Sequence, residues 1–272
     1  MKSPREQNID KELIWIAKAL NLSERALNAL NLILSDDEIQ ASQEYANTVS
    51  IIRLGYNDHG PVHMRTVALN SVIMLDLLKK AGINTSLEND KCGDFEDSVI
   101  AVIFACILHD LGMGMGRVNH ELHSTILASP ILNRLLDKVY GNDLQKKTMV
   151  RALAMECIAG HMGTISITSL EAGVVQVADG CDMSKGRARI PIALNYSALR
   201  TGHIHQYSAN SIIEVKICAG NEKPIRVDVL MDSEVGLFQV EEVLLHKIAN
   251  STAKPYIELY AKVNEQNETR YL

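Results

Sequence analysis

The fold is decided by the stretch Ile107-Leu108-His109-Asp110-Leu111-Gly112, in which an apolar run ends abruptly on an adjacent histidine and aspartate. The residues from Ser98 to Leu108 are almost all apolar and predict a buried helix. An imidazole and a carboxylate at a buried helix end are costly unless both are paired or bind a metal. An ordinary polar helix end before a glycine cap at Gly112 is the alternative, and the stretch alone does not choose between the two.

Helical periodicity continues on both sides of this stretch. Residues 9–50 predict three amphipathic helices, and a fourth runs from Pro61 to about Lys80. Asp94 is placed to cap the central buried helix, and the glycines that follow Asp110 interrupt regular structure. Further helices are predicted from about 119, over 143–159 and over 168–182. The sequence therefore predicts a mainly α fold, with a helical bundle over residues 1–202.

The pattern changes after about residue 200. Residues 211–217 and 225–230 alternate between apolar and polar side chains, as do residues 257–263, and each predicts a strand. Residues 238–250 have helical spacing between the second and third strands. We therefore expect a small α+β domain of β-β-α-β order over residues 203–272. Its edge strands could pair with a second copy, so this domain is a candidate for forming a homo-oligomer.

Composition sets limits on the partners. The chain has 272 residues, of which 47% are hydrophobic and 22% charged, and its net charge of −6 argues against a nucleic-acid backbone as the main partner. A small phosphorylated substrate, held by a local basic cluster, is compatible with this charge. The five cysteines form no C-x-x-C pair and suit core positions in a reducing compartment. Without a visible signal peptide or an uncharged membrane-length run, we expect a cytoplasmic protein with no membrane partner.

Several histidines and aspartates lie on or beside the predicted helices, and they are candidates for metal ligands. Imidazole nitrogens with a few carboxylates suit Mn, Fe, Co, Ni or Zn better than Mg or Ca. A single histidine of this kind is more often a satisfied core residue than a ligand. No compact H-x-x-x-H pair is present, so spacing alone leaves both interpretations open. The candidates are His63, His109, Asp110, His120, His161 and Asp179.

The order and local contexts of these residues resemble the HD-domain metal-dependent phosphohydrolase superfamily over residues 50–190. The matching contexts are His63-Met64-Arg65-Thr66-Val67-Ala68, Leu108-His109-Asp110-Leu111-Gly112, Arg117-Val118-Asn119-His120-Glu121 and Val177-Ala178-Asp179-Gly180-Cys181-Asp182. The resemblance implies a site within residues 59–187 that holds two divalent transition-metal ions. One ion would bind His63, His109, Asp110 and Asp179, and a second would bind His120 and His161, with Asp110 bridging.

One departure from the family pattern is at a position where a side chain is expected to bind phosphate. Several branches of the superfamily carry a lysine where this chain has Met113. Arg117 is the nearest cation that could replace it, and the basic segment after Asp179 could hold phosphate by charge-assisted hydrogen bonds. Each of these residues could equally be a solvated loop residue. The candidate substrate-binding residues are His59, Arg117, Lys185 and Arg187, and the candidate catalytic residues are Asp110, Arg117 and His123.

Three functions are compatible with this pattern. The leading hypothesis is a phosphohydrolase, in which a metal-activated water attacks the phosphorus of a phosphomonoester, a nucleotide or a phosphodiester. A di-iron oxygenase of the same superfamily would use the same ligands for oxygen chemistry. A non-catalytic module for ligand sensing or assembly would keep the metal only for structure. The sequence does not specify the substrate.

Overall fold

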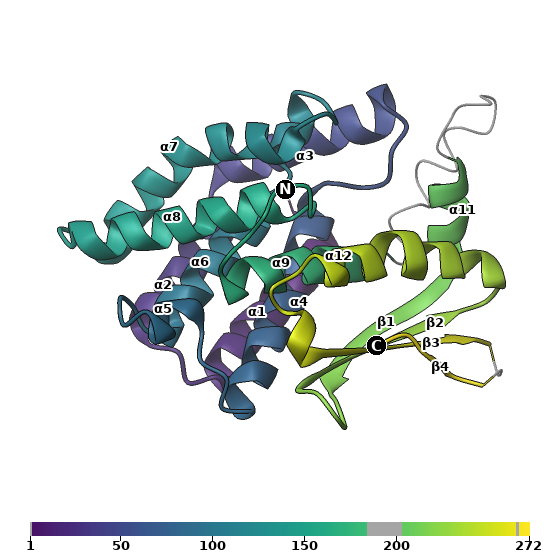
Figure 1. The fold of residues 1–272 in the computed structure, drawn as a ribbon. Helices are drawn as coiled ribbons and strands as arrows, with labels where there is room; N and C mark the ends of the chain where they lie inside the picture. The colour runs from purple at the N-terminus through teal and green to yellow at the C-terminus, as the bar shows by residue number, and fades with distance from the viewer. Residues whose placement is uncertain (1, 184–202, 265–266) are drawn as a thin grey trace.

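The computed structural model describes residues 2–183, 203–264 and 267–272, and its architecture is mainly helical with a small sheet near the C-terminus (Figure 1). This confirms the predicted fold class. The helical part contains α1 (Pro4–Ala19), α2 (Glu24–Leu34), α3 (Asp37–Thr48), the π-helix η1 (Val49–Arg53), α4 (Pro61–Lys80), α5 (Ser86–Asn89), α6 (Phe95–Leu108), the 3₁₀ turn η2 (Leu111–Gly114), α7 (His120–Tyr140), α8 (Leu144–Gly160) and α9 (Leu170–Cys181).

Helix α6 is the centre of the bundle, and its N-terminus is a capping box. The Asp94 carboxylate accepts from the backbone N–H of Asp97, and the Asp97 carboxylate accepts from the backbone N–H of Asp94. Every residue of α6 except Glu96 is buried, because α2, α4, α8 and α9 pack around it. Phe95–Gly114 is long and apolar enough to cross a membrane, but 94% of its most apolar window is buried inside the fold.

A buried arginine connects the helices around the C-terminal end of α6. The Arg65 guanidinium on α4 donates to Asp10 Oδ1 on α1 at 2.9 Å and to Gln43 Oε1 on α3 at 3.0 Å. The Gln43 amide in turn donates to the carbonyl of Ile107 at 2.7 Å, in the last turn of α6. Since buried polar groups are stable only when paired, this network fixes the end of α6 relative to α1, α3 and α4.

The C-terminal part contains α11 (His203–Asn210), β1 (Ile212–Ala219), β2 (Ile225–Met231), the turn η3 (Glu234–Gly236), the π-helix η4 (Gln239–Leu244), α12 (Leu245–Ala249), the turn η5 (Lys254–Tyr256), β3 (Ile257–Val263) and β4 (Thr269–Arg270). The strand order is β1-β2-β3-β4, with β2 and β3 parallel and the other pairs antiparallel. The helical segment η4–α12 lies in the connection that a parallel pair requires. The predicted β-β-α-β order is present, with α11 and β4 as additions.

The sheet packs against the helical part. In β2, Ile225, Val227, Val229 and Met231 are buried and belong to the same contiguous apolar core as the helices. Strands β1 and β2 contact α4, while η4 and α12 contact α9 (Figure 1). The predicted domain boundary after residue 202 falls at the end of a segment, 184–202, that is outside the described residues, so the division into two domains stays a prediction.

Candidate metal centre

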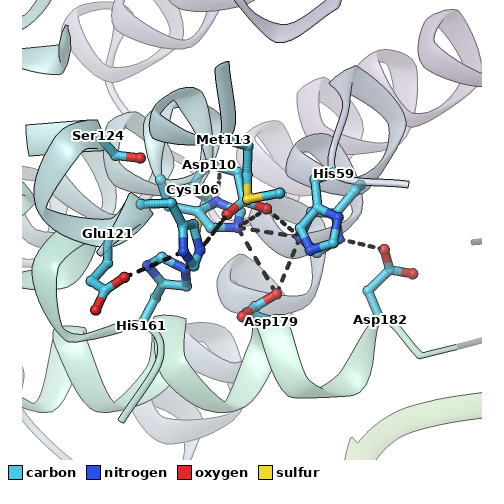
Figure 2. A network of polar contacts seen from close by, with 12 residues as sticks. His59, Cys106, Asp110, Met113, Glu121, Ser124, His161, Asp179 and Asp182 are labelled. Carbon is cyan, nitrogen blue, oxygen red and sulfur yellow. Dashed lines mark hydrogen bonds and ion pairs between the residues drawn. The ribbon is translucent and has the colours of Figure 1, made fainter. Parts of the chain in front are cut away.

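Five helices direct their ends toward one point, where the six candidate ligands meet. Figure 2 labels three of these ligands, Asp110, His161 and Asp179. His63 lies in the first turn of α4, Asp179 in the last turn of α9, and His120 opens α7. His109 and His161 are the C-caps of α6 and α8, and Asp110 follows His109 directly. All six side chains are buried, and their possible ligand atoms form three overlapping groups within 4.8 Å. The structure thus brings together every residue that the sequence singled out as a metal ligand.

Gly112 allows the chain to return His120 to this point. Its backbone N–H donates to Ser124 Oγ at 2.8 Å, which fixes the turn η2 against the start of α7. A Cβ atom at Gly112 would lie 2.1 Å from the His120 carbonyl oxygen, much closer than any carbon–oxygen contact allows. Glycine is therefore required here for a close approach of two backbones, and not for an unusual φ angle.

The four histidines share one hydrogen-bonding arrangement, which sets the tautomer of each ring. His63 Nδ1 lies 2.7 Å from Asp182 Oδ2. The Nδ1 atoms of His109, His120 and His161 lie 2.7–2.9 Å from backbone carbonyl oxygens three residues before each histidine. Because these partners only accept, each Nδ1 carries a proton, and a neutral ring then has its lone pair on Nε2. Arg117 Nη1 donates to His120 Nε2 at 3.3 Å, which agrees with a lone pair on that nitrogen.

The Nε2 atoms form two pairs around Asp110. His63 and His109 have their Nε2 atoms 3.2 Å apart and lie 3.3 and 3.2 Å from Asp110 Oδ2. His120 and His161 also have their Nε2 atoms 3.2 Å apart, and they lie 3.2 and 3.6 Å from Asp110 Oδ1. Asp179 Oδ1 joins the first pair, 3.1 Å from His63 Nε2. One carboxylate therefore presents a different oxygen to each histidine pair.

These residues fit a metal centre. Facing lone pairs and carboxylate oxygens repel one another in a buried site, and a cation between them removes the repulsion. Nitrogen and oxygen ligands about 2.1 Å from an ion lie about 3.0–3.4 Å apart in octahedral or tetrahedral geometry. Apart from the 3.6 Å between His161 Nε2 and Asp110 Oδ1, the separations given above are within that range. Asp110 Oδ1 is buried and has no hydrogen-bond partner among the described residues, as expected for an atom that binds an ion. The buried cluster could therefore hold a metal ion.

Electrostatics keep the cluster in the protonation state that metal binding needs. Burial lowers the pKa of His161 to about 4, so its imidazole is neutral at pH 7. Burial alone would raise the pKa of Asp110, but the positive charge of the His109 and His59 rings, when these are protonated, outweighs burial and holds that pKa well below the ordinary value. For Asp179 the same penalty of burial is outweighed by the Lys247 ammonium, so its pKa is also far below the ordinary value. Both carboxylates are ionised.

Three residues at the site were not predicted from the sequence. Asp182 orients His63, and Glu121 Oε2 lies 3.3 Å from His120 Nδ1. Asp182 lies within the matching family context, one helical turn after Asp179, and that spacing was the available signal. Lys247 is paired with Asp179 Oδ2 from α12, and no local pattern in the sequence connects two residues so far apart.

A cavity of about 390 Å³ opens onto the cluster. Its walls come from the loop before α4, from Asp110 and the residues around it, and from η4 and α12. Arg117 and His59 both line this cavity, and their role in binding substrate stays a prediction. Arg117 also lies with its guanidinium 5.8 Å from the ring centroid of Tyr56, another lining residue. The walls combine apolar surface with a few convergent polar groups, as in small-molecule sites.

The remaining predicted residues are placed differently. His123 is half-buried on α7, where its Nδ1 has no hydrogen-bond partner among the described residues, and it is absent from the residues that line the cavity. Met113, at the position of the family lysine, is buried beside Arg117. Lys185 and Arg187 lie outside the described residues, so their predicted contact with phosphate stays a prediction.

Comparison with known proteins finds a relative that matches most of the chain. The uncharacterized protein MJ1020 of Methanocaldococcus jannaschii is 39% identical over 234 residues, which are 86% of this chain and 88% of that protein. The chain belongs to the same family as that protein. No family model matches the chain described here, and no solved structure matches it either.

Two further relatives match over part of their length. Ribonuclease Y from Borrelia garinii subsp. bavariensis and ribonuclease Y from Borreliella afzelii are each 30% identical to the chain over 149 residues. These residues are 53% of this chain but 26% of either ribonuclease. The chain thus matches about a quarter of these ribonucleases. The similarity and the buried His/Asp cluster are both in keeping with an HD-type hydrolase, while membership of the superfamily stays a prediction.

Proposed function

We propose that this protein is a metal-dependent phosphohydrolase of the HD type. The observation that carries the proposal is the convergence of four imidazole Nε2 atoms on the two oxygens of one buried carboxylate, Asp110. The similarity to ribonuclease Y supports it, because cleavage of RNA is phosphodiester chemistry. The arrangement favours two divalent transition-metal ions, since Mn, Fe, Co, Ni and Zn accept imidazole ligands readily.

The residues would divide into two sets. His63, His109 and Asp179 would hold one ion, His120 and His161 would hold the other, and Asp110 would bind both. Ions held by these residues would supply an activated water near neutral pH and positive charge that neutralises phosphate oxygens. Each Nδ1 partner described above would keep its imidazole oriented, and burial of the cluster would exclude competing bulk water.

The cavity supports a small phosphorylated substrate, such as a nucleotide. Its volume of about 390 Å³ is within the usual range for small-molecule sites. Arg117 would bind a phosphate oxygen there, after releasing the hydrogen bond that it now donates to His120 Nε2. Tyr56 and Met162 offer apolar surface to the organic part of the substrate.

The test is phosphate release by the metal-loaded protein on a panel of phosphomonoesters, nucleotides and phosphodiesters, with Mn, Co, Ni and Mg compared. We expect metal-dependent hydrolysis that falls at least about a hundred-fold in Asp110→Asn, because that change removes the charge both ions would share. Asp137→Asn, at an exposed carboxylate on α7, is the matched control and should retain activity. Hydrolysis that survives Asp110→Asn would refute the proposal.

A further inference from the structure

The contact between α12 and α9 brings a lysine from the C-terminal part into the cluster. Lys247 Nζ forms an ion pair with Asp179 Oδ2 and donates to the carbonyl of His161 at 3.0 Å. The side chain is 8% exposed, which is unusual for a lysine. Removing an ammonium from water is costly, so a buried lysine requires an ion-pair partner or a bound ligand.

Residues on one face of α9 contact the backbone and the side chain of Lys247. The Gln176 side-chain amide donates to the Lys247 carbonyl at 3.0 Å, which fixes the lysine backbone. A Cβ at Gly180 would lie 3.1 Å from Lys247 Cδ, so the absence of a side chain there leaves room for the lysine stem. Gln176, Asp179 and Gly180 are three and four residues apart and therefore share one face of α9. The lysine is thus held at its backbone, its stem and its charged end.

The ammonium lies beside the metal cluster without blocking it. Asp179 presents Oδ1 to His63 Nε2 at 3.1 Å and Oδ2 to Lys247, so an ion and the lysine could use the carboxylate together. An ammonium has three donors, and Lys247 uses two of them on partners among the described residues. Lys247 also lines the same cavity as Asp110 and Arg117. A third donor is therefore available to a ligand in that cavity.

We infer that Lys247 binds a phosphate oxygen of the substrate and supplies the cation that Met113 does not. Lys247 and Arg117 line one cavity from different parts of the fold, so a phosphate between them would receive charge-assisted hydrogen bonds from both. The inference rests on the proposed function, because it names a substrate contact of the same site. It also makes the C-terminal part a component of the site.

Binding of inorganic phosphate to the full-length Mn-loaded protein, measured by calorimetry, tests this inference without requiring turnover. Lys247→Met should weaken phosphate binding about 10- to 100-fold at unchanged metal content, because one charge-assisted hydrogen bond is lost. Lys247→Arg should restore part of the affinity. Lys254→Met, at an exposed lysine in η5, is the control and should bind as the wild type does. Lys247→Gln provides a second neutral variant if the methionine variant unfolds.

Three results would overturn the inference. Equal phosphate affinity in the wild type and the neutral Lys247 variants would exclude the contact, as would a metal-loaded wild type that binds no phosphate. A loss of phosphate binding that follows entirely from a loss of metal would show that Lys247 only positions Asp179. The proposed function fails separately, if the wild type binds phosphate through Lys247 but hydrolyses no phosphate ester.

With an active substrate, a second readout distinguishes contact from positioning. Loss of a substrate contact in Lys247→Met should raise KM and the inhibition constant for phosphate together. A defect in the metal cluster would instead lower kcat and be relieved by added metal. A lower kcat with unchanged KM and unchanged phosphate inhibition would contradict the inferred contact.

Discussion

Gly112→Ala provides a steric test of how the site is assembled. The added Cβ would lie 2.1 Å from the His120 carbonyl oxygen and 2.6 Å from the Ser124 backbone nitrogen. A carbon–oxygen contact is normally about 3.3 Å or longer, so η2 and the start of α7 must separate by about 1.2 Å. Overpacking of this kind costs about 1–3 kcal/mol. The displacement would carry His120 away from Asp110, although metal–ligand distances tolerate only about 0.2 Å.

Two measurements follow from this displacement. Thermal unfolding of Gly112→Ala without metal should show a midpoint lower by about 2–10 °C, as expected for 1–3 kcal/mol in a chain of this size. The variant should also retain less transition metal than the wild type. Gly114→Ala is the control, because its Cβ would meet the Tyr45 ring at 3.2 Å, and that half-exposed side chain can move. A Gly112→Ala protein with wild-type stability and metal content would refute the steric argument.

Three further predictions concern the rest of the fold. A thiol reagent should label exposed Cys92 first and should reach Cys106, whose pKa is raised to about 12 by burial, only after unfolding; early labelling of Cys106 would contradict the described core. The hydrogen bonds from Arg134 lower the pKa of Asp36, so this pair should stabilise the protein above about pH 4, the usual carboxyl pKa, and lose that effect as pH falls through the lowered value. The difference in urea unfolding free energy between the wild type and Asp36→Asn should therefore shrink on acidification, and a constant difference would exclude the effect. Arg65→Met should lower the free energy of unfolding by about 1–3 kcal/mol, because it leaves the buried Gln43 Oε1 without its donor, while Asp10 keeps its ion pair with Lys2; an unchanged urea midpoint would contradict that.

The sequence predicted the elements of the fold well where one local signal dominated. The uninterrupted apolar run before His109 indicated a buried helix, and the Asp94 cap fixed where that helix begins. The alternation of apolar and polar residues predicted β2, in which every second side chain is buried. The short strand β4 and helix α11 were missed, because two residues are too few for a period and α11 has no clear apolar stripe.

The part of the candidate site that has a local sequence signal was also predictable. The six clustered residues have chemistry and order that the family resemblance could identify, and all six converge. Lys247 was not predictable, because its role depends on how α12 packs against α9, and that packing is a tertiary property. Tertiary packing also explains the placement of His123, which shares a helix face with His120 but is absent from the residues that line the cavity. Helical spacing gives the direction of a side chain on its own helix but not the location of a cavity.

The metal content of the purified protein tests the central claim most directly. We predict about two transition-metal ions per chain by elemental analysis after loading and desalting, and less than one in Asp110→Asn that remains folded by circular dichroism. Asp137→Asn, prepared in parallel, should match the wild type. A wild-type protein that retains no metal, or an Asp110→Asn protein that retains as much as the wild type, would contradict the account.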